Sequence, residues 1–401
     1  AIDKKLKYRV QIALSQQSMN RDTLKQIKRD NIETNEQYID FVKEIEKRNK
    51  NPTCALIIPL PDETKQTYFE SVKELMDSEV GLTTFTLMML QGAELGREDA
   101  IKKYGMKSKW RIVPRDFGDY RGKKVFDVER VCVATDTMSF EDYIICRRFS
   151  LIIDLFCNSV FFPLIKLIRE EFGISHFEFV KAVFDNLEKN NNKEYLDTHS
   201  TNKFSKIYFD FSRECEQELF DSKEDIYTFY SKDENYNQLL SSELGDNLLR
   251  KYSTTLICNA LTEVINLSIY LIPNMIVKDG LSKDDTRGIL NSLKLWLTNL
   301  YVFDALFDWE KEKNNETEIN LEFDVPTWFQ SNKKNILNFK KKINYKLVCN
   351  KRNEDLKDEI LALFGNKDTI FSVGKYFHTT GMGLRSTDDI KKSSVRLPVR
   401  S

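Results

Sequence analysis

The sequence predicts a chain in two parts: an incomplete α/β barrel of the TIM type built from parallel strands, followed by a mostly α-helical domain. In residues 1–104, apolar runs of strand length alternate with amphipathic helical patterns, which is typical of parallel strands joined by right-handed crossovers. Beyond residue 139, helical patterns follow one another. The 401 residues include only 14 glycines and 8 prolines, so turn signals are few and helices should be long.

Three apolar segments are predicted as the parallel strands. Residues Tyr8–Ser15 alternate loosely, Cys54–Ile58 is a continuous apolar run, and Leu82–Met89 is a third segment of strand length. An unbroken apolar run is typical of a strand that is buried on both faces of a parallel sheet. Three strands would leave an exposed edge, so we expect them to be part of a larger open barrel.

Helices are predicted between these strands. Asn20 is a good N-cap for a short helix that carries Leu24 and Ile27. The pattern over Asn35–Arg48 is amphipathic, and Thr64 begins another amphipathic helix.

Polar segments follow each strand at the edge where ligands bind in parallel sheets. These segments are Ser15–Ser18, Pro59–Glu63 and Gln91–Glu94. The carboxyl ends of parallel strands lie at one edge, so the sequence predicts a binding site there.

The remaining chain is divided by pattern. Residues 105–138 are predicted as a linker with short strands at Trp110–Pro114 and Lys124–Ala134, residues 139–385 as a helical domain, and 386–401 as a loose tail. Residues 310–318 are predicted as a polar loop. The helices predicted in the helical domain, after a first one that starts near Ser139, are Phe162–Phe172, His176–Glu188, Lys203–Glu218, Leu244–Leu271, Lys283–Phe303, Gln330–Lys342 and Asp355–Phe364.

Composition narrows the function classes. The net charge is -1, so no overall field favours nucleic acid or an anionic membrane. Seven dispersed cysteines in apolar segments indicate free thiols and a reducing cytoplasm. No apolar run reaches the roughly 18 residues of a membrane span. Because the chain lacks an initiator Met and enters a strand almost at once, we expect it to be the C-terminal part of a longer protein.

Four motifs, taken in order, resemble the second half of the barrel in radical S-adenosylmethionine (SAM) enzymes of the group that also carries a cobalamin-binding domain. The first two are Gln17-Ser18 and, about a dozen residues later, Arg29-Asp30-Asn31-Ile32. The resemblance implies that Gln17 and Arg29 contact SAM, whose carboxylate suits a guanidinium and whose ribose suits an amide. Alternatively, Arg29 is only a basic residue at a helix C-terminus.

The third motif is Pro59-Leu60-Pro61-Asp62-Glu63-Thr64, where the family has Gly-Leu-Pro-Gly-Glu-Thr. Pro59 and Asp62 stand in place of glycines that let the backbone approach the nucleoside. Helix capping is the favoured role for Asp62, Glu63 and Thr64.

The fourth motif is Gln91-Gly92-Ala93-Glu94-Leu95 after the third strand, where the family has Pro-Gly-Thr-Glu-Leu. Glu94 is either a substrate-side residue or a solvated charge. The resemblance as a whole implies a SAM site that includes Ser15, Gln17, Arg29, Pro59, Leu60 and Gly92.

Residues after the third strand also match family segments. Tyr104, Arg111 and Arg115 are substrate-side candidates, and it is equally open that they anchor the linker by hydrogen bonds.

The family's cluster motif, Cys-x-x-x-Cys-x-x-Cys, does not occur in the sequence, nor does the Asp-x-His-x-x-Gly cobalamin motif. The three histidines lack metal-ligand spacing, so no metal ligand is expected in this chain. The [4Fe-4S] cluster and the cobalamin are therefore expected on the missing N-terminal half of the same polypeptide.

The resemblance implies an intact enzyme that cleaves SAM reductively to start radical chemistry on a small-molecule substrate. Methyl transfer from cobalamin to an unactivated carbon is one outcome, and flavodoxin or ferredoxin would supply the electron. Two alternatives stay open: a radical SAM enzyme without cobalamin, resembling methylthiotransferases or coproporphyrinogen oxidases, and a non-catalytic binding or scaffold protein.

Overall fold

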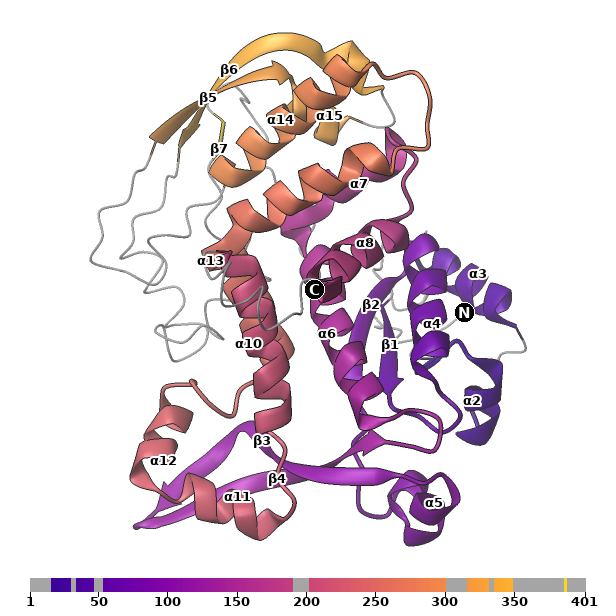
Figure 1. The fold of residues 1–401 in the computed structure, drawn as a ribbon, viewed down its shortest axis with the longest axis vertical. Coiled ribbons are helices and arrows are strands. Elements are labelled where there is room, and N and C mark those ends of the chain that lie inside the picture. The colour runs from indigo at the N-terminus through magenta and orange to yellow at the C-terminus, as the bar shows by residue number, and fades with distance from the viewer. Residues whose placement is uncertain are drawn as a thin grey trace, which may run out of the picture. The chain divides into compact units, whose positions relative to one another are not determined.

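The structure is a computed structural model that describes residues 16–29, 34–46, 53–189, 202–300, 316–331, 335–348 and 386–387. The chain forms two compact units. Unit 1 comprises Ala1–Asp154 and Phe211–Leu248, and unit 2 comprises Leu155–Asp210 and Leu249–Ser401. The fold class is mixed α/β, with small sheets of few strands (Figure 1). The described residues form no closed barrel.

The first sheet of unit 1 is parallel, as predicted. Strand β1 (Thr53–Ile58) pairs in parallel with β2 (Gly81–Thr86), and Gln17 forms a parallel bridge to Leu56 on the other edge of β1. Residues Tyr8–Ser15, predicted as the first strand, lie outside the described residues.

Helices connect these segments where the sequence predicts them. Asn20 caps α2 (Arg21–Gln26), α3 spans Asn35–Glu46, and Thr64 caps α4 (Lys65–Asp77) through a reciprocal capping box with Thr67. The buried face of α4 includes Tyr68, Val72 and Leu75, spaced as one stripe of an amphipathic helix.

The two faces of the β1–β2 sheet differ in burial. Cys54, Leu56 and Ile58 are buried on one face. Alternate residues belong to the opposite face because successive side chains of a strand point to opposite sides. There Ala55 and Ile57 are half-buried, and Phe85 is 49% exposed. The second face is therefore less buried than the first, and Phe85 is its most exposed apolar residue.

A long hairpin forms the second sheet of unit 1. Strands β3 (Lys107–Tyr120) and β4 (Lys123–Ala134) pair antiparallel, with an irregular register between Ile112 and Phe117. Helices α11 (Lys223–Tyr230) and α12 (Asp233–Leu240) lie along the hairpin near its tip, and η1 (Glu94–Gly96) and α5 (Glu98–Lys103) precede it (Figure 1). The apolar core between the hairpin and helices α11 and α12 consists of Ile112, Phe126, Ile226, Tyr230, Tyr236 and Leu239.

This hairpin confirms the strand predicted over Lys124–Ala134, which is β4, whereas the strand predicted over Trp110–Pro114 is part of the longer β3. Its strands have 14 and 12 residues, and β4 joins the parallel sheet through an antiparallel bridge between Met88 and Val131. Two backbone hydrogen bonds support the bridge, from the Met89 amide to the Arg130 carbonyl and from the Cys132 amide to the Leu87 carbonyl. The segment that follows β2 is thus hydrogen-bonded to the hairpin, and the parallel part of the sheet ends at β2.

Helix α6 (Phe140–Phe156) follows the hairpin, and its residues up to Asp154 belong to unit 1. The ring of Phe149 stacks on Phe69 of α4 at 4.2 Å between centroids. The Tyr68 hydroxyl lies 2.9 Å from the Ser150 hydroxyl. Helices α4 and α6 are therefore fixed to each other by a stacked pair and a buried hydrogen bond.

Unit 2 contains helices and one antiparallel sheet of β5 (Glu316–Phe323), β6 (Lys340–Val348) and β7 (Ser386–Thr387). Its other elements are η2 (Ser159–Phe161), α7 (Phe162–Glu170), α8 (His176–Lys189), the first half of α10 (Lys203–Gln217), α13 (Leu248–Leu271), η3 (Ile272–Asn274), α14 (Lys283–Leu300), α15 (Val325–Gln330) and η4 (Ile336–Phe339).

Two predictions for this region are wrong. The helix predicted over 330–342 is instead η4 followed by the start of β6, and 316–318 of the predicted loop begin β5. In β5, Ile319, Leu321 and Phe323 are buried and alternate with exposed residues, which is the period of a strand. Consecutive lysines at the start of β6 obscured the same alternation. The predicted helix Asp355–Phe364 lies outside the described residues.

The apolar helix α13 is the segment of the described chain that, together with η3, is long and apolar enough to cross a membrane by length and composition. Half of its most apolar window is buried inside the protein. Its exposed positions are Asn259, Thr262, Asn266 and Tyr270, which form a polar stripe along one side. This pattern is typical of a core helix.

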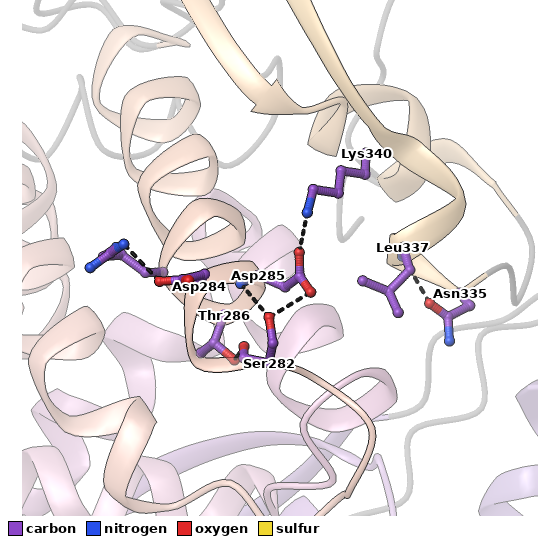
Figure 2. A network of polar contacts seen from close by, with 8 residues as sticks. Ser282, Asp284, Asp285, Thr286, Asn335, Leu337 and Lys340 are labelled. Carbon is purple, nitrogen blue, oxygen red and sulfur yellow. Dashed lines mark hydrogen bonds and ion pairs between the residues drawn. The ribbon is translucent and has the colours of Figure 1, made fainter.

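The start of α14 is held by a network of polar contacts (Figure 2). The Ser282 hydroxyl accepts a hydrogen bond from the Asp285 amide at 3.0 Å and donates to the Asp285 carboxylate at 2.6 Å. The Lys340 ammonium of β6 binds the same carboxylate at 2.6 Å. Asp285 therefore links the helix N-terminus to the sheet.

We expect Ser282→Ala to lower the free energy of unfolding by about 1 kcal/mol, because the α14 amides lose their cap. Urea unfolding followed by circular dichroism measures this change. Thr262→Ala, an exposed substitution within α13, is the control and should leave stability nearly unchanged. Equal effects of the two variants would contradict the capping role.

Candidate functional site

The candidate site begins with a buried carboxyl group at the carboxyl end of β1. Glu63 is 1% exposed and lies between the end of β1 and the start of α4. Its carboxylate accepts a hydrogen bond from the Ser18 hydroxyl at 2.5 Å and another from the Thr67 hydroxyl at 2.8 Å. Its backbone carbonyl accepts from the Thr137 hydroxyl at 2.8 Å. One residue thus connects the segment after Gln17, the end of β1 and the loop after β4.

Burial raises the pKa of Glu63 to about 7, although the hydrogen bonds from Ser18 and Thr67 act in the opposite direction. A carboxyl group with this pKa is able to accept or donate a proton near neutral pH. It is also the kind of perturbed group that marks functional sites.

The loop that carries Glu63 adopts a backbone conformation that favours glycine. Asp62 has a positive φ of 59°. Aspartate tolerates this left-handed region better than most residues, so the loop keeps a bend that a glycine would form. The prediction of capping is confirmed for Thr64, whereas Glu63 points into a buried hydrogen-bond network and caps nothing.

A second group of polar contacts is exposed. The Lys28 ammonium, just after α2, binds the Glu94 carboxylate of η1 at 2.7 Å and lowers the pKa of that carboxyl. The Tyr104 hydroxyl donates to the Gln26 side chain at 3.2 Å and accepts from the Lys103 ammonium at 2.7 Å. The substrate-side candidates Glu94 and Tyr104 therefore both lie against the end of α2.

The residues assigned to the SAM site lie around the sheet edge. Gln17 is bonded to β1 through its backbone, with amide and carbonyl contacts to Ala55 and Ile57 at 3.0 and 2.9 Å. Arg29 is exposed after α2. Gly92 is exposed with a φ of 86°, and nothing lies within 4 Å of where a Cβ would stand. Ser15 lies outside the described residues.

Pro59 and Leu60 are both buried directly after β1. Leu60 belongs to an apolar cluster with Leu87, Met89, Met106 and Cys132. Its side chain therefore contributes to the core beneath the loop.

Arg111 and Arg115 occupy the hairpin. The Arg111 guanidinium binds Glu129 at 2.6 Å and Glu218 at 3.2 Å, and all three side chains are less than a fifth exposed. Arg115 is exposed with a φ of 65°, and its amide donates to the Gly245 carbonyl at 3.3 Å. These contacts fit the anchoring role that was left open for both arginines.

Sequence reasoning missed the pairing of Ser18 with Glu63. The two residues are 45 positions apart, so no local pattern connects them. The available signal was a glutamate at a strand end beside the threonines of a capping box.

The described cysteines are Cys54, Cys132, Cys146, Cys157, Cys215 and Cys258, and all are free thiols. Among the described residues, no group of three or more His, Cys, Asp or Glu side chains is placed to hold a metal ion. Comparison of the chain with models of known protein families and with curated protein sequences gave no match.

We predict that Glu63→Gln flattens the dependence of stability on pH. The folded state holds the Glu63 proton more tightly than the unfolded chain, so the free energy of unfolding falls as pH rises from 4.5 to about 7. That interval corresponds to a loss on the order of 3 kcal/mol. Urea unfolding of both proteins at about pH 5 and about pH 8 measures the difference.

Glu70→Gln is the matched control, because Glu70 is an exposed carboxylate on the same helix α4. It should keep the pH dependence of the unsubstituted protein. A Glu63→Gln variant with an unchanged pH profile would show that this carboxyl is not a buried titrating group.

Proposed function

We propose that this chain is the C-terminal portion of a radical SAM enzyme, in which the parallel sheet of unit 1 supplies the second half of a partial barrel. The intact enzyme would cleave SAM reductively and use the resulting radical on a small-molecule substrate. Methyl transfer from cobalamin to an unactivated carbon is one outcome of this chemistry.

The less buried face of the β1–β2 sheet, which carries the exposed Phe85, is the main support for this proposal. In an α/β barrel, helices cover the outer face of the sheet and the inner face encloses the ligand side. Here Phe85 is 49% exposed on one face, and Met88 and Leu90 beyond the strand end are 44% and 57% exposed. Further parallel strands from an upstream segment of the same polypeptide would cover such a face and also pair with the edge beside Gln17.

The polar residues at this edge suit a sulfonium nucleotide. The exposed Arg29 offers a guanidinium to a carboxylate, and open space around Gly92 lets a ligand approach the backbone. Gln17 and Ser15 would contribute polar groups, and buried Pro59 and Leu60 would shape the loop after β1. Glu94 and Tyr104 would border the substrate.

The residues described here do not fit an iron-sulfur cluster or cobalamin. A [4Fe-4S] cluster needs three cysteine thiolates that reach one cluster, and the described thiols are dispersed and mostly buried. In the proposed enzyme both groups would bind to the upstream segment, and the cluster would supply the electron that it receives from a flavodoxin or ferredoxin. We propose a cytoplasmic location, where free thiols persist.

SAM binding by the protein expressed from the complete reading frame, with its cluster reconstituted, tests the proposal. We expect the double variant Gln17→Ala/Arg29→Ala to weaken SAM binding by about tenfold or more, because charge-assisted hydrogen bonds are lost. Isothermal titration calorimetry measures the affinity.

The matched control is Gln66→Ala/Arg97→Ala, which removes an exposed amide from α4 and an exposed guanidinium from the start of α5. Its affinity for SAM should be unchanged. A complete protein with neither iron nor SAM affinity would overturn the proposal in favour of a non-catalytic binding or scaffold protein.

A further inference from the structure

A second group of buried charges lies in unit 1, on helix α6 and the elements packed against it. Its centre is Arg147 of α6, which is 5% exposed. Tyr143 lies one helical turn earlier, is 1% exposed, and its hydroxyl is 3.1 Å from the Thr86 hydroxyl at the end of β2. The group therefore lies against the end of the parallel sheet.

One hydrogen-bond donor of Arg147, the buried Nε, has no partner among the described residues. A guanidinium has five N–H donors. One Arg147 Nη contacts the Cys215 sulfur at 3.9 Å, and the guanidinium lies 5.8 Å from the centre of the Phe211 ring. A buried donor without an acceptor is costly, so this Nε favours an added hydrogen-bond acceptor.

The neighbouring groups do not supply that acceptor. Burial raises the pKa of Cys215 to about 12, so this thiol is neutral at physiological pH. The carboxylate that acts on Arg147, Glu218, is bound by Arg111, which also binds Glu129. Glu218 acts on Arg147 electrostatically, but no hydrogen bond joins them.

We infer that Arg147 is the anchor of a binding site for a carboxylate group of a small molecule. The parallel N–H groups of a guanidinium fork match the two oxygens of a carboxylate, and the unpartnered Nε is one arm of that fork. The Tyr143 hydroxyl, one turn away, is a second polar group on the same helix face.

The charges of the group favour a monoanion over a phosphate dianion. Arg111 and Arg147 balance Glu129 and Glu218 before any ligand enters. A single negative charge binds to Arg147 with less repulsion from the two glutamates than a double charge would meet. The site is therefore assigned to a carboxylate.

The Arg147 Nε–H resonance of the full chain, observed by NMR, tests this assignment directly. The resonance is identified by its loss in Arg147→Lys. Titration with sodium propionate should shift it in a saturable manner, whereas propionamide and matched sodium chloride should not. A resonance that does not respond to propionate, or that responds more strongly to inorganic phosphate, would overturn the carboxylate site.

Thermal unfolding gives a second measurement. Propionate should raise the midpoint of the unsubstituted protein, and we expect Arg147→Lys to weaken apparent propionate binding by about tenfold or more, because the bidentate contact is lost. Arg130→Lys, on β4 and half-buried, is the control and should retain the response. If Arg147→Lys does not fold, the thermal midpoint of the unsubstituted protein decides the question: it should rise with propionate and not with propionamide or matched sodium chloride, and no selective rise would overturn the site. Neither measurement needs SAM or iron, so the result is independent of the proposed radical SAM function.

Discussion

The hydrogen bond between Ser18 and Glu63 is the contact on which the candidate site depends. Parallel pairing places the chain after Gln17 level with the end of β1, and the Glu63 carboxyl ties these two segments together. The Glu63 backbone carbonyl adds the loop after β4 through Thr137. Because Glu63 is buried, these hydrogen bonds replace the ones that its carboxyl and carbonyl groups would make with water. They also hold the connected loops at a fixed distance from one another.

The hairpin gives unit 1 its second constraint. Its base pairs with Leu87–Met89, so the chain leaving β2 is fixed by backbone hydrogen bonds. Arg111 binds the hairpin to Glu218, and Arg147 and Tyr143 of α6 lie beside this buried ion pair. Charges that are shielded from water interact strongly. The polar groups of the hairpin, of α6 and of the end of β2 therefore influence one another's electrostatics.

Local patterns were enough to predict β1, α4 and the residue Thr64 that caps α4. The apolar run at Cys54–Ile58 and the Thr64 cap each depend on neighbours within a few positions. Contacts between distant residues were not predictable in this way. Ser18 meets Glu63 and Arg111 meets Glu218 only because the fold brings them together. The strand β6 was missed because it begins with three consecutive lysines, Lys340–Lys342, which hide the alternation in which Tyr345 and Leu347 are buried.

Asp62, with its left-handed backbone conformation, shows that the shape of a loop does not fix its residue types. A left-handed bend that ordinarily favours glycine is formed here by an aspartate, whose side chain adds a carboxylate to the loop. Two proteins with this turn need share no residue at that point. Distant homologues with this turn are therefore better identified by comparing backbone torsion angles than by aligning amino-acid sequences.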